Sequence, residues 1–181
     1  MSCFRAVRYS VAVLVVLTLG LFVAAGVLDY WWVKKIFSSE YRNGLWRNCN
    51  PLTGCKVRKN LMKLKDGIDL NLDIIILALA GGALGALIHL ILILRTMCQG
   101  KPSKKSILVG SIFLFIGVGS GIFGLVWALL KVSDKDQSYA MFCLYGANGL
   151  GLITFVLSCV LLCTRVTRSS YNDDEIAMLQ R

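Results

Sequence analysis

Four long apolar segments divide the chain, and none of them contains an Asp, Glu, Lys or Arg residue. They cover residues 10–28, 74–94, 107–130 and 139–163. About 20 helical residues span the roughly 30 Å hydrocarbon core of a bilayer, so each segment is long enough to cross it. A water-soluble core would require four long helices without a polar face. The sequence therefore predicts one domain, residues 1–181, with four transmembrane helices, a loop at 29–73 and a tail at 164–181.

The first apolar segment follows Arg5 and Arg8, as the apolar core of a cleaved signal peptide also would. Such a core usually has roughly 7–15 residues, and this segment is longer. We therefore expect the segment to be kept as the first transmembrane helix.

The net charge of +10 would suggest a nucleic-acid ligand if the chain were soluble. Its basic residues flank the apolar segments, however, which favours membrane lipids or a charged extracellular partner over nucleic acid. Between the second and third segments, Lys101, Lys104 and Lys105 are expected to contact anionic lipid of the inner leaflet.

Two of the seven cysteines, Cys49 and Cys55, lie close together in the long loop, with Pro51 and Gly54 between them. This spacing favours a tight turn closed by a disulfide. A pair of free thiols and a metal site are the alternatives. A metal site needs further ligands, and the single histidine lies far away in the second segment. We expect neither a metal nor a cofactor.

Charge alone does not decide the orientation, because the long loop and the segments on the opposite side are both rich in Lys and Arg. A disulfide persists on the oxidising side of the membrane. The cysteine pair therefore predicts an extracellular loop, two cytoplasmic termini and a multi-pass protein of the plasma membrane.

Three further cysteines, Cys3, Cys98 and Cys163, lie near the predicted cytoplasmic ends of the helices. Juxtamembrane cysteines are candidates for S-acylation, and unmodified thiols are the alternative. In the tail, Tyr171 precedes three acidic residues and is a candidate phosphorylation site. A flexible, solvated tail is the simpler interpretation.

The long loop contains aromatic and alternating stretches that favour β-strands, at residues 30–33, 45–46 and 56–58. They predict a small antiparallel sheet that rests on the helices, with the cysteine bridge joining two strands. The expected fold is an all-α membrane protein, a four-helix transmembrane bundle with a small antiparallel β-sheet in the first extracellular loop.

A family resemblance rests on this loop. Trp31, then Gly44-Leu45-Trp46, then Cys49 and Cys55 follow the first apolar segment in this order. The arrangement resembles the W…GLW…C…C signature of the claudin superfamily. That superfamily includes the peripheral myelin and epithelial membrane proteins, the lens fibre membrane protein and the calcium-channel gamma subunits.

The signature residues have a structural interpretation. Trp31 and Trp46 can wedge between the sheet and the outer end of the bundle, and Gly44 permits close backbone approach beside Leu45. No nucleophile–base pair, phosphate-binding glycine loop or sheltered carboxylate pair occurs, so we expect no enzymatic activity.

Two functions from different classes fit these features. The resemblance implies a tetraspan protein of cell–cell contacts, junctions or membrane organisation, which would act through its disulfide-closed loop and associate with itself or with other membrane proteins. The alternative is an auxiliary, gamma-like subunit that modulates an ion channel or receptor.

Glycines spaced four residues apart occur in the second and third segments, as Gly81 with Gly85 and Gly117 with Gly121. They predict close helix packing within the chain, with a homo-oligomer face as the alternative. His89 is expected to be a neutral residue that is hydrogen-bonded to Asn148, Ser158 or a backbone carbonyl, and a functional role is the alternative.

Overall fold

The computed structural model describes residues 2–28, 31–36, 39–43, 45–50, 54–57, 70–98, 104–131 and 138–179. Its four helices are α1 (Ser2–Val27), α2 (Leu70–Cys98), α3 (Lys104–Lys131) and α4 (Tyr139–Leu179). Each contains a stretch that is long and apolar enough to cross a membrane: Ala6–Val27, Ile74–Cys98, Lys104–Leu130 and Tyr139–Cys163. The predicted four-span architecture is confirmed.

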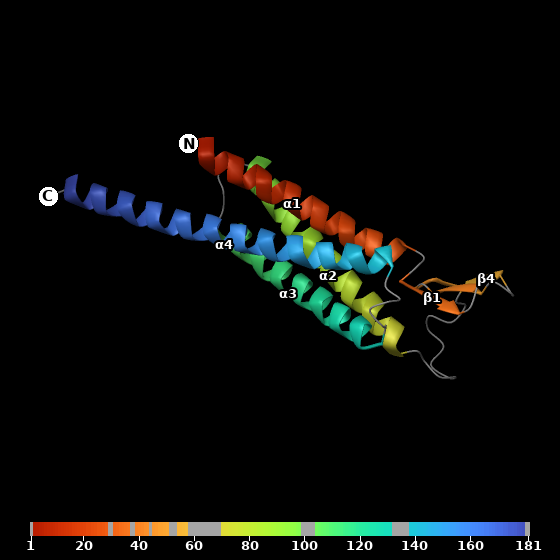
Figure 1. The fold of residues 1–181 in the computed structure, drawn as a ribbon. Helices are drawn as coiled ribbons and strands as arrows, with labels where there is room; N and C mark the ends of the chain where they lie inside the picture. Colours follow the sequence, from red (N-terminus) through yellow and green to blue (C-terminus); the bar gives the residue numbers. More distant parts are fainter. Residues whose placement is uncertain are drawn as a thin grey trace.

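The helices form a ring of neighbours. Helix α1 packs against α2 and α4, and α3 packs against the same two helices, so α2 and α4 lie diagonally across the bundle. Figure 1 shows that both termini lie at one end of the bundle and the strands at the other. We call these the terminal end and the sheet end.

The outward faces of the helices are apolar, as a lipid-facing surface requires. Large hydrophobic side chains such as Leu77 (75% exposed) and Val16 (52% exposed) point away from the bundle. Lipid tails are as apolar as these side chains, so close packing must hold the helices together.

Glycines provide that packing between α2 and α3. A Cβ atom on Gly85 would lie 2.5 Å from the carbonyl oxygen of Phe113 and 2.9 Å from the Cα of Gly117. One on Gly81 would lie 2.8 Å from the hydroxyl oxygen of Ser120. The two helices therefore touch through their backbones, and the predicted glycine pairs pack within the chain.

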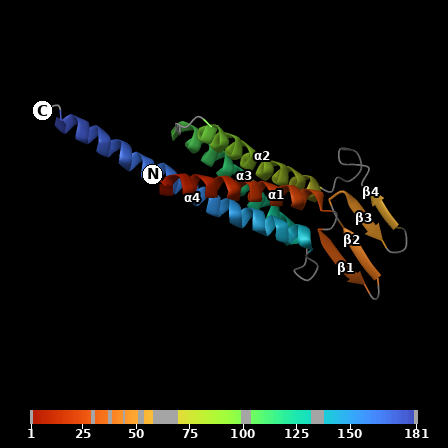
Figure 2. The ribbon, with the colours of Figure 1, turned by 90° about the horizontal axis from the view of Figure 1, so that it is seen from above.

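The sheet has four strands, β1 (Trp32–Ile36), β2 (Ser39–Asn43), β3 (Arg47–Asn50) and β4 (Gly54–Val57). They pair antiparallel in sequence order, which confirms the predicted small antiparallel sheet. Gly54 begins β4 with a φ of 75°, a conformation that glycine adopts without a Cβ clash. Figure 2 shows the sheet lying beyond the sheet end of the helices.

The tail differs from the expected flexible segment. Helix α4 runs for 41 residues and continues from the membrane-spanning stretch, which ends at Cys163, as far as Leu179. No glycine or proline interrupts residues 164–179, and the last turns include the good helix formers Glu175, Ala177 and Met178. In Figure 1, α4 extends past the other three helices at the terminal end.

Candidate functional site

The end of α1 is closed by two tryptophan side chains. The last carbonyl groups of a helix lack partners within the helix. The indole Nε1–H of Trp31 donates to the carbonyl oxygen of Ala25 at 3.0 Å, and that of Trp46 donates to the carbonyl oxygen of Gly26. The sheet is thereby attached directly to the helix that precedes it.

Trp31 also joins the sheet to α4. Its side chain is fully buried and belongs to the same apolar cluster as Leu45, Met141 and Leu144. Its carbonyl oxygen accepts a hydrogen bond from the backbone N–H of Ser138, which precedes α4. A single residue thus fixes the sheet against both α1 and α4.

The two other described residues of the signature have distinct positions. Leu45 is buried in the cluster beneath the sheet, whereas Trp46 keeps its indole partly exposed. An apolar ring with one polar N–H suits the boundary between lipid and water. Gly44 lies outside the described residues, so the structure does not test the expected close backbone approach there.

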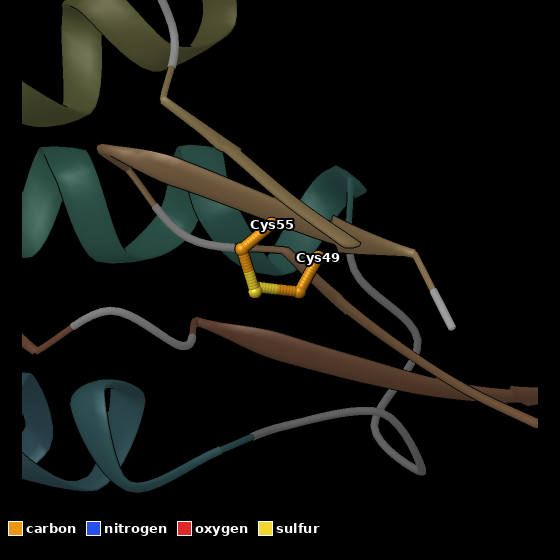
Figure 3. Close-up of a disulfide and its surroundings, with 2 residues drawn as sticks. All are labelled: Cys49 and Cys55. Carbon is orange, nitrogen blue, oxygen red and sulfur yellow. A yellow bond between two sulfur atoms is a disulfide. The ribbon is translucent and has the colours of Figure 1, made fainter. Parts of the chain in front are cut away.

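The expected disulfide is present between Cys49 and Cys55, in the arrangement shown in Figure 3. Cys49 in β3 lies directly opposite Cys55 in β4, with their Cα atoms 3.9 Å apart. The bond therefore joins two neighbouring strands, as predicted, and closes the hairpin at the edge of the sheet.

Exposed cations lie on both faces of the sheet. Arg42 is paired with Cys49 across β2 and β3, and Arg47 is two residues from Cys49, so all three occupy one face. Lys56 follows Cys55 in β4 and therefore occupies the other face. Arg42, Arg47 and Lys56 are all exposed. The described part of the sheet thus presents a basic surface to its surroundings.

A histidine links the diagonal helices inside the bundle. His89 of α2 is fully buried, and its Nε2 lies 3.1 Å from the hydroxyl oxygen of Ser158 in α4. The Ser158 hydroxyl donates to the carbonyl oxygen of Thr154 at 2.9 Å, so the imidazole Nε2–H is the donor to Ser158. This bond matches one of the expected partners.

The other predicted partner of this histidine is engaged elsewhere. The amide nitrogen of Asn148 donates to the carbonyl oxygen of Leu144 at 2.9 Å within α4. Nδ1 of His89 is buried without a hydrogen-bond partner and lies against Gly110, where a Cβ atom would be 2.6 Å away. The described residues contain no group of three His, Cys, Asp or Glu side chains that could hold a metal ion.

The remaining predicted sites lie at the terminal end. Cys98 ends α2 and Cys163 ends the membrane-spanning stretch of α4, and both are exposed and outside the disulfide. Cys3 is in the first turn of α1 and Tyr171 is in the extension of α4, but their side chains are outside the described set. Lys101 lies outside the described residues.

Sequence reasoning placed the tryptophans between the sheet and the bundle but missed how they attach. The indole bonds to the last carbonyls of α1 are contacts between a side chain and a helix end, which no local sequence pattern encodes. One hint is present in the sequence, since Trp31 follows the end of the first apolar segment by only a few residues.

Comparison with known proteins supplies one result. The family described as PMP-22/EMP/MP20/Claudin matches residues 7–161, which is most of the chain. No curated protein matches the chain.

Proposed function

Because this chain belongs to the PMP-22/EMP/MP20/Claudin family, we propose that it is a non-enzymatic protein of cell–cell contacts that acts through its disulfide-closed sheet. Partners on the same or a facing membrane would meet the sheet surface. The sheet would face the cell exterior and both termini the cytoplasm, in the plasma membrane and at cell junctions.

The attachment of the sheet supports this proposal most directly. Trp31 and Trp46 bond to the end of α1, and the backbone of Trp31 bonds to Ser138 before α4. The bundle can therefore hold the sheet in a fixed orientation beyond the membrane. A pre-organised surface loses less conformational entropy on binding than a flexible loop would.

The charge of the sheet indicates the chemistry of its partner. Arg42, Arg47 and Lys56 are exposed on the described strands, and the loop at 29–73 contains more basic than acidic residues. A facing surface that is rich in carboxylate groups would be electrostatically complementary. If the protein lined a paracellular barrier, the same charge would favour anions over cations.

Imaging tests the contact function. The chain is expressed with a fluorescent tag in cells that lack junctions, and tagged cells are mixed with untagged cells. Enrichment at borders with either tagged or untagged neighbours supports a partner on the facing membrane. Enrichment only at borders between two tagged cells would identify that partner as a second copy of the chain. A uniform surface distribution at every border contradicts the proposed function. The matched variant Arg42→Gln/Arg47→Gln/Lys56→Gln should reach the surface but lose enrichment.

Orientation is tested separately by glycosylation-site mapping. An acceptor sequon inserted between Cys49 and Cys55 should be glycosylated, and one appended after Arg181 should not. Glycosylation of the C-terminal tag alone would place the sheet in the cytosol and would contradict the proposed orientation.

An auxiliary-subunit function is the second candidate, and three lipid-facing glycines favour it. Cβ atoms on Gly20, Gly119 and Gly149 would meet nothing within 4 Å. Such positions allow a helix of another membrane protein to approach closely. Affinity purification from mild detergent distinguishes the two functions, because a stoichiometric channel or receptor polypeptide supports the auxiliary role.

Two modifications at the terminal end are also proposed. Cys98 is exposed at the end of α2, Cys163 is exposed at the end of the membrane-spanning stretch of α4, and Cys3 is close to the start of α1, which suits S-acylation. Acyl exchange should label the wild-type chain, and Ser substitutions of the three cysteines should abolish the label.

Phosphorylation of Tyr171 would likewise give a phosphotyrosine signal that Tyr171→Phe removes.

A further inference from the structure

The charged side chains that the structure describes at the terminal end are all basic. Arg95 lies in the last turn of α2, and Lys104 and Lys105 begin α3, and all three are exposed. They lie at the ends of the membrane-spanning stretches Ile74–Cys98 and Lys104–Leu130. Basic residues at the end of a span are close to the lipid headgroups.

The packing of α2 on α3 brings these three cations to one level. Ala78, Gly85 and His89 of α2 lie against Gly124, Gly117 and Gly110 of α3, respectively. This antiparallel register, continued six residues beyond His89, places Arg95 beside the first turn of α3. That turn contains Lys104 and Lys105.

Helix packing fixes the backbone positions of Arg95, Lys104 and Lys105. Thr96 is 1% exposed and Ile107 is 3% exposed, so the helix ends that carry Arg95 and the two lysines are themselves buried against the bundle. Their backbone positions are therefore set by helix packing. This arrangement favours a defined ligand over a diffuse charge effect.

A headgroup with more than one negative charge fits three cations at one level. A phosphodiester headgroup carries one phosphate charge, whereas a phosphomonoester carries about −1.5 to −2 at pH 7. Arginine can bind two phosphate oxygens at once, and the lysines add point charges. We infer that the α2–α3 end, defined by Arg95, Lys104 and Lys105, binds a membrane lipid whose headgroup carries a phosphomonoester.

This lipid site is independent of the proposed contact function, because it lies at the opposite end of the molecule from the sheet. Loss of lipid binding would leave enrichment at cell borders unchanged. Loss of enrichment would likewise leave lipid binding unchanged, so the two proposals fail separately.

Native mass spectrometry of the full chain in mild detergent tests the site. Phosphatidic acid is the phosphomonoester probe, phosphatidylserine is the phosphodiester comparison and phosphatidylcholine is the background lipid. The wild-type chain should retain one phosphatidic acid molecule in preference to phosphatidylserine. At about fivefold per cation, Arg95→Gln/Lys104→Gln/Lys105→Gln should weaken binding roughly 100-fold.

A matched control removes the same charge from the other end. Arg42→Gln/Arg47→Gln/Lys56→Gln deletes three exposed cations of the sheet and should bind phosphatidic acid as the wild type does. Thermal melting of each variant checks the fold. If the triple variant fails to fold, Lys104→Gln/Lys105→Gln replaces it, with an expected loss of about 25-fold.

Three results would overturn the inference. They are equal retention of phosphatidylserine and phosphatidic acid, unchanged binding by the variants at the α2–α3 end, and an equal loss in the sheet control. Inorganic phosphate at millimolar concentration should not displace the lipid, and displacement would mean that a soluble anion occupies the site.

Discussion

Trp31 forms a directional bond and fills space with the same ring. Its buried ring packs with Leu45, and its indole N–H donates a hydrogen bond to the carbonyl oxygen of Ala25 at the end of α1. Each contribution can be removed without the other, because phenylalanine keeps most of the ring but has no N–H group. The tryptophan therefore allows the hydrogen bond and the packing to be measured separately.

Trp31→Phe should lower the free energy of unfolding by about 1 kcal/mol beyond the loss of ring volume, because it leaves the Ala25 carbonyl unpaired. Trp31→Ala should lower it by about 3–5 kcal/mol. The matched control is Trp127→Phe, since the indole nitrogen of Trp127 is buried without a partner. Melting in mild detergent measures both. Equal losses for the two Phe variants would mean that the indole bond contributes nothing.

The disulfide between Cys49 and Cys55 also stabilises the sheet through individual residues. A bond across a loop of this size stabilises the folded chain by about 2 kcal/mol. Cys49→Ser should therefore reduce surface delivery and cause retention in the secretory pathway, measured by surface biotinylation and glycan maturation of a sequon-tagged chain. Cys143→Ser, a free cysteine of α4, is the control. Normal delivery of Cys49→Ser would argue that the bridge is dispensable for folding.

Helices and strands differ in how well the sequence predicts them. The four spans follow from length and composition, because a bilayer demands about 20 apolar residues in a row. The start of α2 at Leu70 was missed, since Asn71 and Asp73 fall outside the apolar stretch. The extension of α4 was missed as well, because residues 164–179 have moderate helix propensity and no apolar stripe that predicts packing.

The sheet was predicted in kind but not in register. Aromatic residues and the cysteine pair indicated strands, but residues 45–46 form a bend between β2 and β3. Strand β2 (Ser39–Asn43) is polar and gave no such indication. Its place follows from pairing with β1 and β3, which local propensity does not encode. The indole hydrogen bonds of Trp31 and Trp46 to the end of α1 are likewise tertiary contacts, which local propensity does not encode.

Glycine substitutions should separate the inner face of a helix from its lipid face. Gly85→Ala places a Cβ atom 2.5 Å from the Phe113 carbonyl oxygen and should cost about 1–3 kcal/mol, because two backbones must separate. Gly119→Ala meets nothing within 4 Å and should be neutral or slightly stabilising. Detergent melting of both variants checks this. A similar loss at Gly119 would contradict the packing described for α2 and α3.

His89 and Gly110 should be energetically coupled. A Cβ atom at Gly110 would lie 2.6 Å from the imidazole Nδ1, so Gly110→Ala should be destabilising alone and nearly neutral beside His89→Ala. A double-mutant cycle should give a coupling of about 0.5–3 kcal/mol. The pair His89→Ala with Gly119→Ala is the additive control. Additivity at Gly110 would show that the ring does not determine the need for glycine there.

At the scale of the whole molecule, the bundle and the extension of α4 are separable. The described core ends at Leu161, and the residues that hold the sheet lie at the opposite end. A chain truncated after Thr164 should therefore melt within a few degrees of the full chain and keep its disulfide. A large drop in melting temperature would mean that the extension contributes to the stability of the bundle.

The length of α4 also determines how far its last turn lies from its membrane-spanning stretch. At about 1.5 Å per residue, its last turn stands roughly 24 Å beyond Cys163. A soluble domain of about 100 residues has a radius of gyration near 13 Å. A soluble domain of this size that binds the last turn of α4 would therefore meet the helix well beyond the end of its membrane-spanning stretch.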